Sequence, residues 1–177
     1  MISKPHFQGL DTAFLQLSFA MQLLHHIAHD RIPRALFNSD LTVIGSNGVP
    51  FVTRKFQTDN DVTLAAENNV SISFGTVAIT LWEAIREHSG LDNSTITPAA
   101  SPREMLAGLA YAIRCCFAHG TVEPRWRLTP KYRIEYQLGS LGIDLRAVDG
   151  QPFEYHQVGG FDVLITLRAH ATSAGLL

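Results

Sequence analysis

An arginine and a histidine separated by four residues form the sharpest chemical motif in the sequence. Residues 114–120 read RCCFAHG, at the carboxyl end of a predicted helix. A histidine can take a proton from a ribose 2′-OH or give one to a leaving oxygen, because its side chain titrates near neutral pH. An arginine can hold a phosphate and offset the charge that builds on it. The pair Arg114 and His119 therefore predicts a phosphodiester-cleaving site.

The placement of this pair on its helix also predicts a second copy of the chain. On a helical wheel Arg114 lies opposite the apolar stripe, and His119 lies roughly 140° from Arg114. Neither charge needs to enter the core of its own subunit. The face between them is mostly small enough to let another backbone approach, and it carries Ala107, Gly108, Tyr111, Cys115 and Ala118. We expect a homodimer that packs through this face.

The motif resembles the signature of the HEPN superfamily, small helical-bundle domains that share an Arg, four to six residues, and then a His. Arg114, Ala118, His119 and Gly120 match that signature. Cys115 differs, because the family commonly has a polar residue there, often Asn. The resemblance covers residues 114–120 strictly and residues 11–120 loosely.

The resemblance implies a metal-independent endoribonuclease without a cofactor. It implies a dimer whose two motifs, each Arg114 with His119, face each other across the interface. It also implies a defence or toxin–antitoxin role, with RNA as the target and an antitoxin as a candidate partner. Many members are noncatalytic, so an interaction module that binds a protein or a nucleotide stays open, and Cys115 favours it. Simple stabilisation of a helix end by two cations is a further alternative.

A basic segment follows the motif directly. Residues 125–133 hold four positive charges, no negative ones and two aromatic side chains, a composition suited to phosphates and stacked bases. The alternative is a solvated strand edge protected by charge. We expect this segment to bind RNA through Arg125, Trp126, Arg127, Lys131 and Arg133.

Two histidines on the first predicted helix raise the question of a metal site. His25 and His29 are four residues apart, which is a spacing that metal ligands use on a helix. A site would need a third ligand brought close by folding, and His6, His156 and His170 are candidates. An exposed polar helix face explains the histidines more simply, so no metal ligand is predicted.

Three helices must position these residues. Apolar periodicity predicts helices over 11–29 and 70–88. A third helix over 102–119 has the clearest start, because Ser101 is followed by proline and then by Glu104 in the pattern of a capping box. Its core stripe consists of Met105, Leu106, Leu109, Ala112, Ile113, Cys116 and Phe117.

The remaining segments predict loops and strands. Residues 33–58 contain prolines and the turn-prone segment 45–48, so we expect a loop that holds a short hairpin. A second hairpin is expected between residues 132–138 and 143–148. Residues 161–173 fit a strand or a helix, and their alanines favour a helix. We therefore expect one domain over 1–177, a mainly α fold with a four- to five-helix bundle and a small antiparallel β-hairpin.

Composition limits the function classes. The chain has 177 residues, of which 46% are hydrophobic and 17% charged, with a net charge of −2. The low charge favours an oligomer, and the near-neutral balance confines any polyanion site to a local patch. Adjacent Cys115 and Cys116 exclude a disulfide scaffold. No apolar run spans a membrane and no secretory signal precedes the first helix, so a cytoplasmic location is expected.

Overall fold

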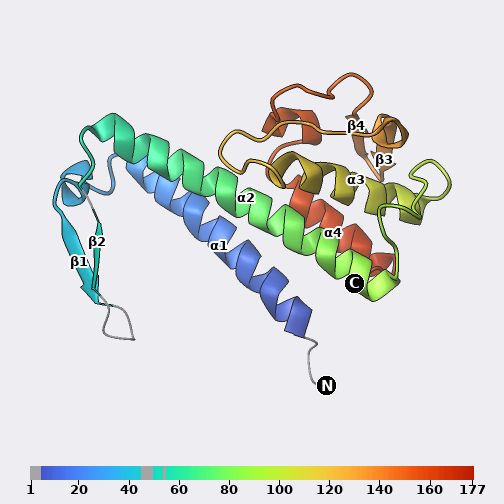
Figure 1. Cartoon of the computed structure of the whole chain (residues 1–177), viewed down its shortest axis with the longest axis horizontal. Helices are drawn as coiled ribbons and strands as arrows, with labels where there is room; N and C mark the ends of the chain where they lie inside the picture. The colour runs from blue at the N-terminus through green and yellow to red at the C-terminus, as the bar shows by residue number, and fades with distance from the viewer. Residues whose placement is uncertain (1–4, 45–49, 54) are drawn as a thin grey trace.

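The computed structural model describes residues 5–44, 50–53 and 55–177 (Figure 1). Within these ranges the chain is mainly α, as the sequence predicts. Four α-helices carry the fold: α1 (Pro5–Ala28), α2 (Asp59–Ser89), α3 (Pro102–Phe117) and α4 (Val163–Ser173). Two antiparallel hairpins join them, one formed by β1 (Leu41–Ile44) with β2 (Pro50–Thr53) and one by β3 (Glu135–Leu138) with β4 (Leu141–Asp144). Short 3-10 turns occupy η1 (Arg34–Phe37), η2 (Pro130–Tyr132) and η3 (Tyr155–Val158).

The helices form two parts along the length of α2 (Figure 1). Helices α1 and α2 pack as a long antiparallel pair, and the β1–β2 hairpin projects from the end of that pair where the two helices are joined. The other half of α2 packs against α3 and α4, and the β3–β4 hairpin packs on α3. The candidate site residues all come from this second part.

Helix α2 begins at Asp59, ahead of the predicted start at Val70. The side chain of Thr58 accepts a hydrogen bond from the backbone N–H of Asp61 at 3.2 Å, and the Asp61 carboxylate accepts one from the Thr58 N–H at 2.8 Å. This capping box fixes the start. The buried stripe also continues backwards in steps of four through Ala66 and Val62. Polar residues between these positions obscured the periodicity in the sequence.

Helix α1 also begins earlier than predicted, at Pro5, where proline suits the first turn of a helix. The expected hairpin within 33–58 is confirmed as β1–β2, with Leu41 paired to Thr53. The predicted turn at 45–48 lies outside the described residues. Residues 163–173 form a helix, so the ambiguity at the end of the chain is settled in favour of α4.

The predicted start of α3 is confirmed, with one change in its cap. The Ser101 hydroxyl accepts a hydrogen bond from the Glu104 N–H at 3.2 Å and donates one to the Glu104 carboxylate at 2.9 Å. That carboxylate accepts its backbone hydrogen bond from the Thr97 N–H at 3.1 Å rather than from Ser101. The cap therefore also anchors the loop that precedes the helix.

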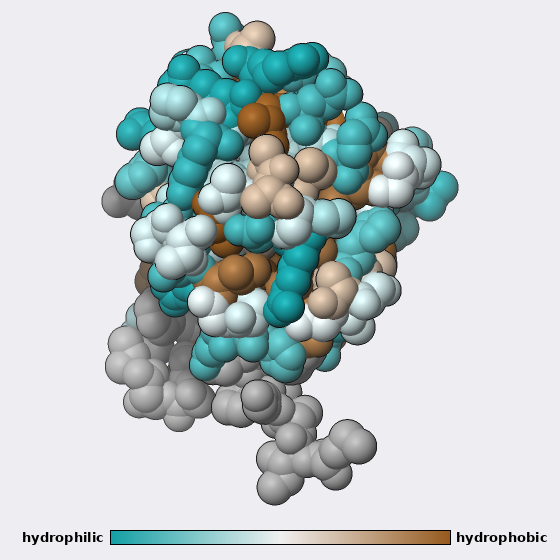
Figure 2. Space-filling view, turned by 90° about the vertical axis from the view of Figure 1, so that its right-hand side faces the viewer, coloured by the Kyte–Doolittle hydropathy of each residue, from teal (hydrophilic) through white to brown (hydrophobic). Residues whose placement is uncertain are grey.

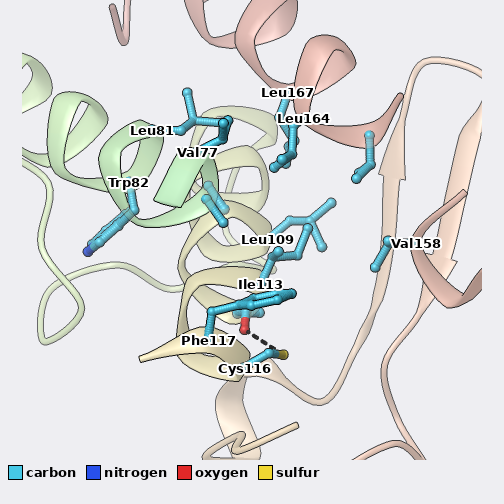
Figure 3. Close-up of a cluster of buried hydrophobic side chains, with 14 of the residues drawn as sticks. Val77, Leu81, Trp82, Leu109, Ile113, Cys116, Phe117, Val158, Leu164 and Leu167 are labelled. Atoms are coloured by element: carbon cyan, nitrogen blue, oxygen red, sulfur yellow. Dashed lines mark hydrogen bonds between the residues drawn. The ribbon is translucent and has the colours of Figure 1, made fainter. Parts of the chain in front are cut away.

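The core lies where α2, α3 and α4 meet (Figure 3). Phe74 of α2 contacts the rings of Phe117 and Tyr155, at centroid distances of 5.3 and 5.1 Å. Gly75 lets α3 approach closely, because a Cβ atom there would lie 2.7 Å from the Phe117 ring. The predicted stripe of α3 is buried at most of its positions, including Leu106, Leu109, Ala112, Ile113, Cys116 and Phe117.

The small-residue face of α3 is filled by this same chain. A Cβ atom on Gly108 would lie 2.7 Å from Pro98 Cγ, so the loop before α3 occupies the space expected for a second backbone. The ring of Tyr111 packs against Trp82 and Tyr132, with centroids 5.2 and 4.8 Å away. Ala107 is fully buried. Ala107 and Gly108 are therefore not available to a second copy, and the homodimer itself stays a prediction.

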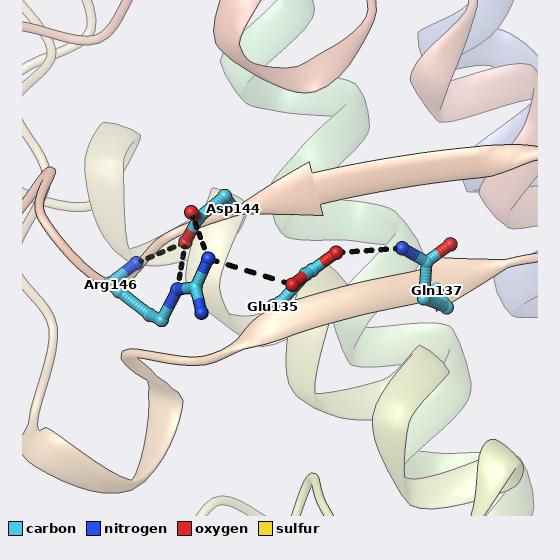
Figure 4. Close-up of polar contacts among 4 residues, drawn as sticks. All are labelled: Glu135, Gln137, Asp144 and Arg146. Carbon is cyan, nitrogen blue, oxygen red and sulfur yellow. Dashed lines mark hydrogen bonds and ion pairs between the residues drawn. The ribbon is translucent and has the colours of Figure 1, made fainter.

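The β3–β4 hairpin is more compact than predicted, with a turn of two residues between the strands. Gly139 has φ 61°, which suits the first position of such a turn. Polar side chains line one side of the hairpin (Figure 4). The Asp144 carboxylate accepts hydrogen bonds from Arg146, and Arg146 lies 3.5 Å from Glu135.

The surface seen in Figure 2 is mainly hydrophilic, with apolar side chains showing in separate small patches. The largest exposed apolar side chains on α1 are Leu15 and Phe19, at 72% and 65% exposure. None of the helices in the described ranges has the length and apolar character to cross a membrane.

Candidate functional site

His119 lies in a small hollow next to the end of α3, together with two arginines of the basic segment. The hollow measures about 30 Å³, room for one or two ligand atoms rather than a whole nucleotide. We call it the basic hollow, and it is lined by Cys116, His119, Gly120, Glu123, Arg125 and Arg127. Two guanidinium groups, an imidazole and one carboxylate line it, a local excess of positive charge in a chain with a net charge of −2.

The backbone of the basic segment explains why both arginines face the hollow. The N–H of Trp126 donates to Gln151 O at 3.0 Å, and the N–H of Gly150 donates to Trp126 O at 2.9 Å. Along this antiparallel pairing successive side chains point to opposite sides. Trp126 is buried, so its neighbours Arg125 and Arg127 are exposed. Among the described residues, neither arginine has a hydrogen-bond or ion-pair partner, so both guanidinium groups are available to an anion.

Trp126 anchors this segment and does not face solvent. Its exposure is 0%, and its indole Nε1 donates a hydrogen bond to Gln157 Oε1 at 2.7 Å. Its ring packs against Phe153 with centroids 5.3 Å apart. A base cannot reach a ring that is enclosed in this way, so the expected stacking role of Trp126 is corrected to a positioning role.

Lys131 and Arg133 are bound to their own chain. The Lys131 ammonium donates to the backbone oxygens of Asn93 at 2.6 Å and Ile96 at 3.1 Å. Arg133 donates to Leu128 O at 2.9 Å and forms an ion pair with Asp149. Both cations hold loops in place. Of the five residues expected to bind RNA, only Arg125 and Arg127 combine exposure with a free charge in the described structure.

Arg114 does not line the basic hollow. Its Nε atom is buried and makes no hydrogen bond with any described residue. Arg114 is close enough to Tyr111 to oppose the rise in pKa that burial causes in the Tyr111 hydroxyl. Within the described part of one chain, Arg114 therefore does not share the basic hollow with His119.

Cys116 lines the hollow without adding a nucleophile. Burial raises the pKa of its thiol far above the usual range, and the nearby Cys115 adds to that rise. The thiol donates a hydrogen bond to Ala112 O at 3.5 Å. It stays protonated at neutral pH, and a protonated thiol is a poor nucleophile and metal ligand.

His25 and His29 stack on the exposed side of α1. Their ring centroids are 4.2 Å apart, and His29 Nδ1 lies 2.8 Å from His25 O. The charges of His29, Arg31 and His26 lower the pKa of His25, with His29 the largest cause. The described residues contain no cluster of three side chains that could hold a metal ion. Neither His156 nor His170 therefore supplies the third ligand that the metal alternative requires, and the side chain of His6 lies outside the described residues.

Glu123 is the member of the hollow that the motif analysis missed. It is the one acidic residue between His119 and Arg133 in the sequence, and its position beside several basic residues is the signal that could have identified it. A carboxylate beside an imidazole offers a proton acceptor and a proton donor at one site. The two arginines would bind the phosphate between them. This set can carry out acid–base chemistry on a phosphodiester.

Comparisons with known proteins provide no relative from which a role could be carried over. No family model, no curated protein and no solved structure matches this chain.

Proposed function

We propose that this chain binds RNA at the basic hollow and cleaves it there without a metal ion. One observation carries the proposal: His119, Glu123, Arg125 and Arg127, all from the segment that connects α3 to η2, line the same hollow. Exposed guanidinium groups without protein partners bind phosphate well, and histidine is the side chain most often used for proton transfer.

The proposed reaction is an attack of the ribose on its own phosphate. The Glu123 carboxylate takes the proton of the 2′-OH, and the 2′-oxygen forms a bond to phosphorus. The bond from phosphorus to the 5′-oxygen breaks, and protonated His119 gives its proton to that oxygen. The products are a 2′,3′-cyclic phosphate and a free 5′-OH. Arg125 and Arg127 offset the negative charge that develops on the phosphoryl oxygens.

The HEPN resemblance extends this proposal to partners and setting. We propose a HEPN-like homodimer in the cytoplasm that acts in defence or in a toxin–antitoxin pair, with an antitoxin as its protein partner. The helical architecture is compatible with that resemblance. Arg125 and Arg127 take over the phosphate-binding role expected of Arg114, which lies outside the hollow.

A second candidate is a noncatalytic interaction module, and an apolar groove favours it. The groove between α1 and α4 measures about 300 Å³ and includes Phe14, Met21, Phe161 and Ile165 in its lining. Ile165 is exposed, and Leu15 and Phe19 stand on the outer side of α1. A partner protein could cover these side chains.

Cleavage of a mixed-sequence RNA in the presence of EDTA tests the proposed function. We expect His119→Ala to lower the cleavage rate by about 100-fold or more, because general acid–base catalysis contributes about 10² to 10⁴. His88→Ala is the matched control, since His88 is exposed on α2 and does not line the hollow. If wild type and both variants bind RNA and none of them cleaves it, the result would contradict cleavage and favour the interaction module.

A further inference from the structure

A second hollow lies beside the basic hollow, with the chain segment 122–125 between them. Its volume is about 200 Å³. We call it the base hollow, and it is lined by Glu67, Asn68, Ser71, Val122, Pro124, Phe153 and Tyr155. Val122 and Pro124 face this hollow, whereas Glu123 and Arg125 line the other. A ligand that binds phosphate at the basic hollow would need only a short reach to enter the base hollow.

The aromatic side of the base hollow is rigid. The Tyr155 ring stacks on Phe161 with centroids 4.2 Å apart and meets Phe153 edge to face at 5.4 Å. The Ser71 hydroxyl donates to Thr121 O at 2.6 Å, which ties α2 to the segment that separates the two hollows. A wall held in this way can receive a flat ring without rearranging.

The polar side of the base hollow has unused hydrogen-bonding groups. Glu67 and Asn68 follow each other on α2 and both line the hollow. In the described part of the structure neither side chain has a hydrogen-bond or ion-pair partner. A carboxylate accepts hydrogen bonds at two oxygens, and an amide both donates and accepts. The hollow therefore combines aromatic rings with the two acceptor oxygens of Glu67 and with the Asn68 amide, which both donates and accepts.

These groups select one kind of base. Guanine is the base whose Watson–Crick edge presents two adjacent donors, its N1–H and its N2–H, which fit the two oxygens of a carboxylate. Adenine presents one donor beside one acceptor, so it pairs poorly with a carboxylate and well with an amide. Proteins read unpaired RNA bases in this way, through their edges and by aromatic contact.

We propose that the base hollow binds an unpaired guanine of the RNA whose phosphate lies in the basic hollow, with Glu67 as the residue that selects it. This inference rests on the proposed RNA-binding function. It gives the protein a preference for guanosine at the site of phosphate binding.

Binding of two fluorescently labelled RNA hexamers tests this inference. Both carry 2′-O-methyl groups, which prevent cleavage; one is all adenosine and the other has a single central guanosine. We expect wild type to bind the guanosine hexamer about tenfold more tightly. Glu67→Gln should remove or invert the preference, because an amide matches adenine. Glu83→Gln should retain it, since Glu83 is exposed about 24 Å further along α2.

The outcomes separate this inference from the proposed function. Equal binding of both hexamers by wild type, or an unchanged preference in Glu67→Gln, would overturn the proposal that the base hollow selects guanine through Glu67. RNA binding at the basic hollow would still stand. Failure of wild type to bind either hexamer would overturn the proposed function and this inference together.

Discussion

At the scale of single residues, neighbouring positions in the motif region have opposite roles. Trp126 is enclosed in the core, and the arginines on either side of it are exposed. Residue types alone therefore overestimated the RNA-binding set: Trp126, Lys131 and Arg133 have the right chemistry, but their partners are within the chain. Successive side chains of a paired segment point to opposite sides, and this alternation decides which cations are exposed and can bind an anion.

Gly108 lies on the face of α3 that the sequence predicts to contact a second copy, and its substitution tests whether Pro98 of the same chain fills that space. Gly108→Ala should lower the free energy of unfolding by about 1–3 kcal/mol, because its Cβ atom would lie 2.7 Å from Pro98. Gly9→Ala on α1 is the control; no atom lies within 4 Å of its added Cβ, so a gain of about 0.5–1 kcal/mol is expected. Urea denaturation measures both. Dissociation of a dimer by Gly108→Ala, without loss of stability, would restore the interface interpretation.

At the scale of elements, the sequence predicted those with strong local signals. The start of α3 was predictable because Ser101 and Glu104 act within one turn. The start of α2 was missed although the hydrogen bonds between Thr58 and Asp61 are also local, because polar residues interrupt the apolar pattern after them. Val62 and Ala66 belong to the buried stripe through their contact with Ile27 of α1, a residue distant in sequence. One part of the basic hollow was predictable, because His119 and the basic segment are close in sequence. The absence of Arg114 from its lining was not predictable, because it depends on how α3 packs.

The β3–β4 hairpin provides an element-scale prediction about pH. Hydrogen bonds from Arg146 lower the pKa of Asp144 to about 2. A carboxyl group with a lowered pKa adds stability above its unfolded pKa of about 3.9 and loses it as the pH falls towards the folded value. Asp144→Asn should therefore be less stable than wild type at pH 7, and the difference should shrink as the pH falls from about 4 to 2.

Urea midpoints at pH 7, 4 and 2 measure this difference. Arg146→Gln is the control, because without the guanidinium the Asp144 carboxyl keeps only the backbone hydrogen bond from residue 146 and its pKa is lowered less. A difference between wild type and Asp144→Asn that stays constant over this pH range would show that the ion pair does not contribute to stability.

At the scale of the whole molecule, the two hollows lie in the part built by α2, α3 and the segments that follow α3. Helix α2 also lines the base hollow through Glu67, Asn68 and Ser71, and α1 packs along α2 (Figure 1). The exposed side chains of Leu15 and Phe19 belong to α1, so the free cations and these apolar side chains lie on different elements. This separation is compatible with RNA binding at one place and contact with a protein at another.

The salt dependence of RNA binding tests the central claim most directly. Each phosphate contact with a single strand adds about 0.7 to the slope of log affinity against log salt concentration. Because Arg125 and Arg127 bind one phosphate between them, replacing both with alanine should reduce that slope by about 0.7 and weaken binding on many sequences alike. Arg86→Ala, an exposed arginine of α2 that does not line the hollow, should leave it unchanged. An unchanged slope in the double variant would contradict phosphate binding at the basic hollow.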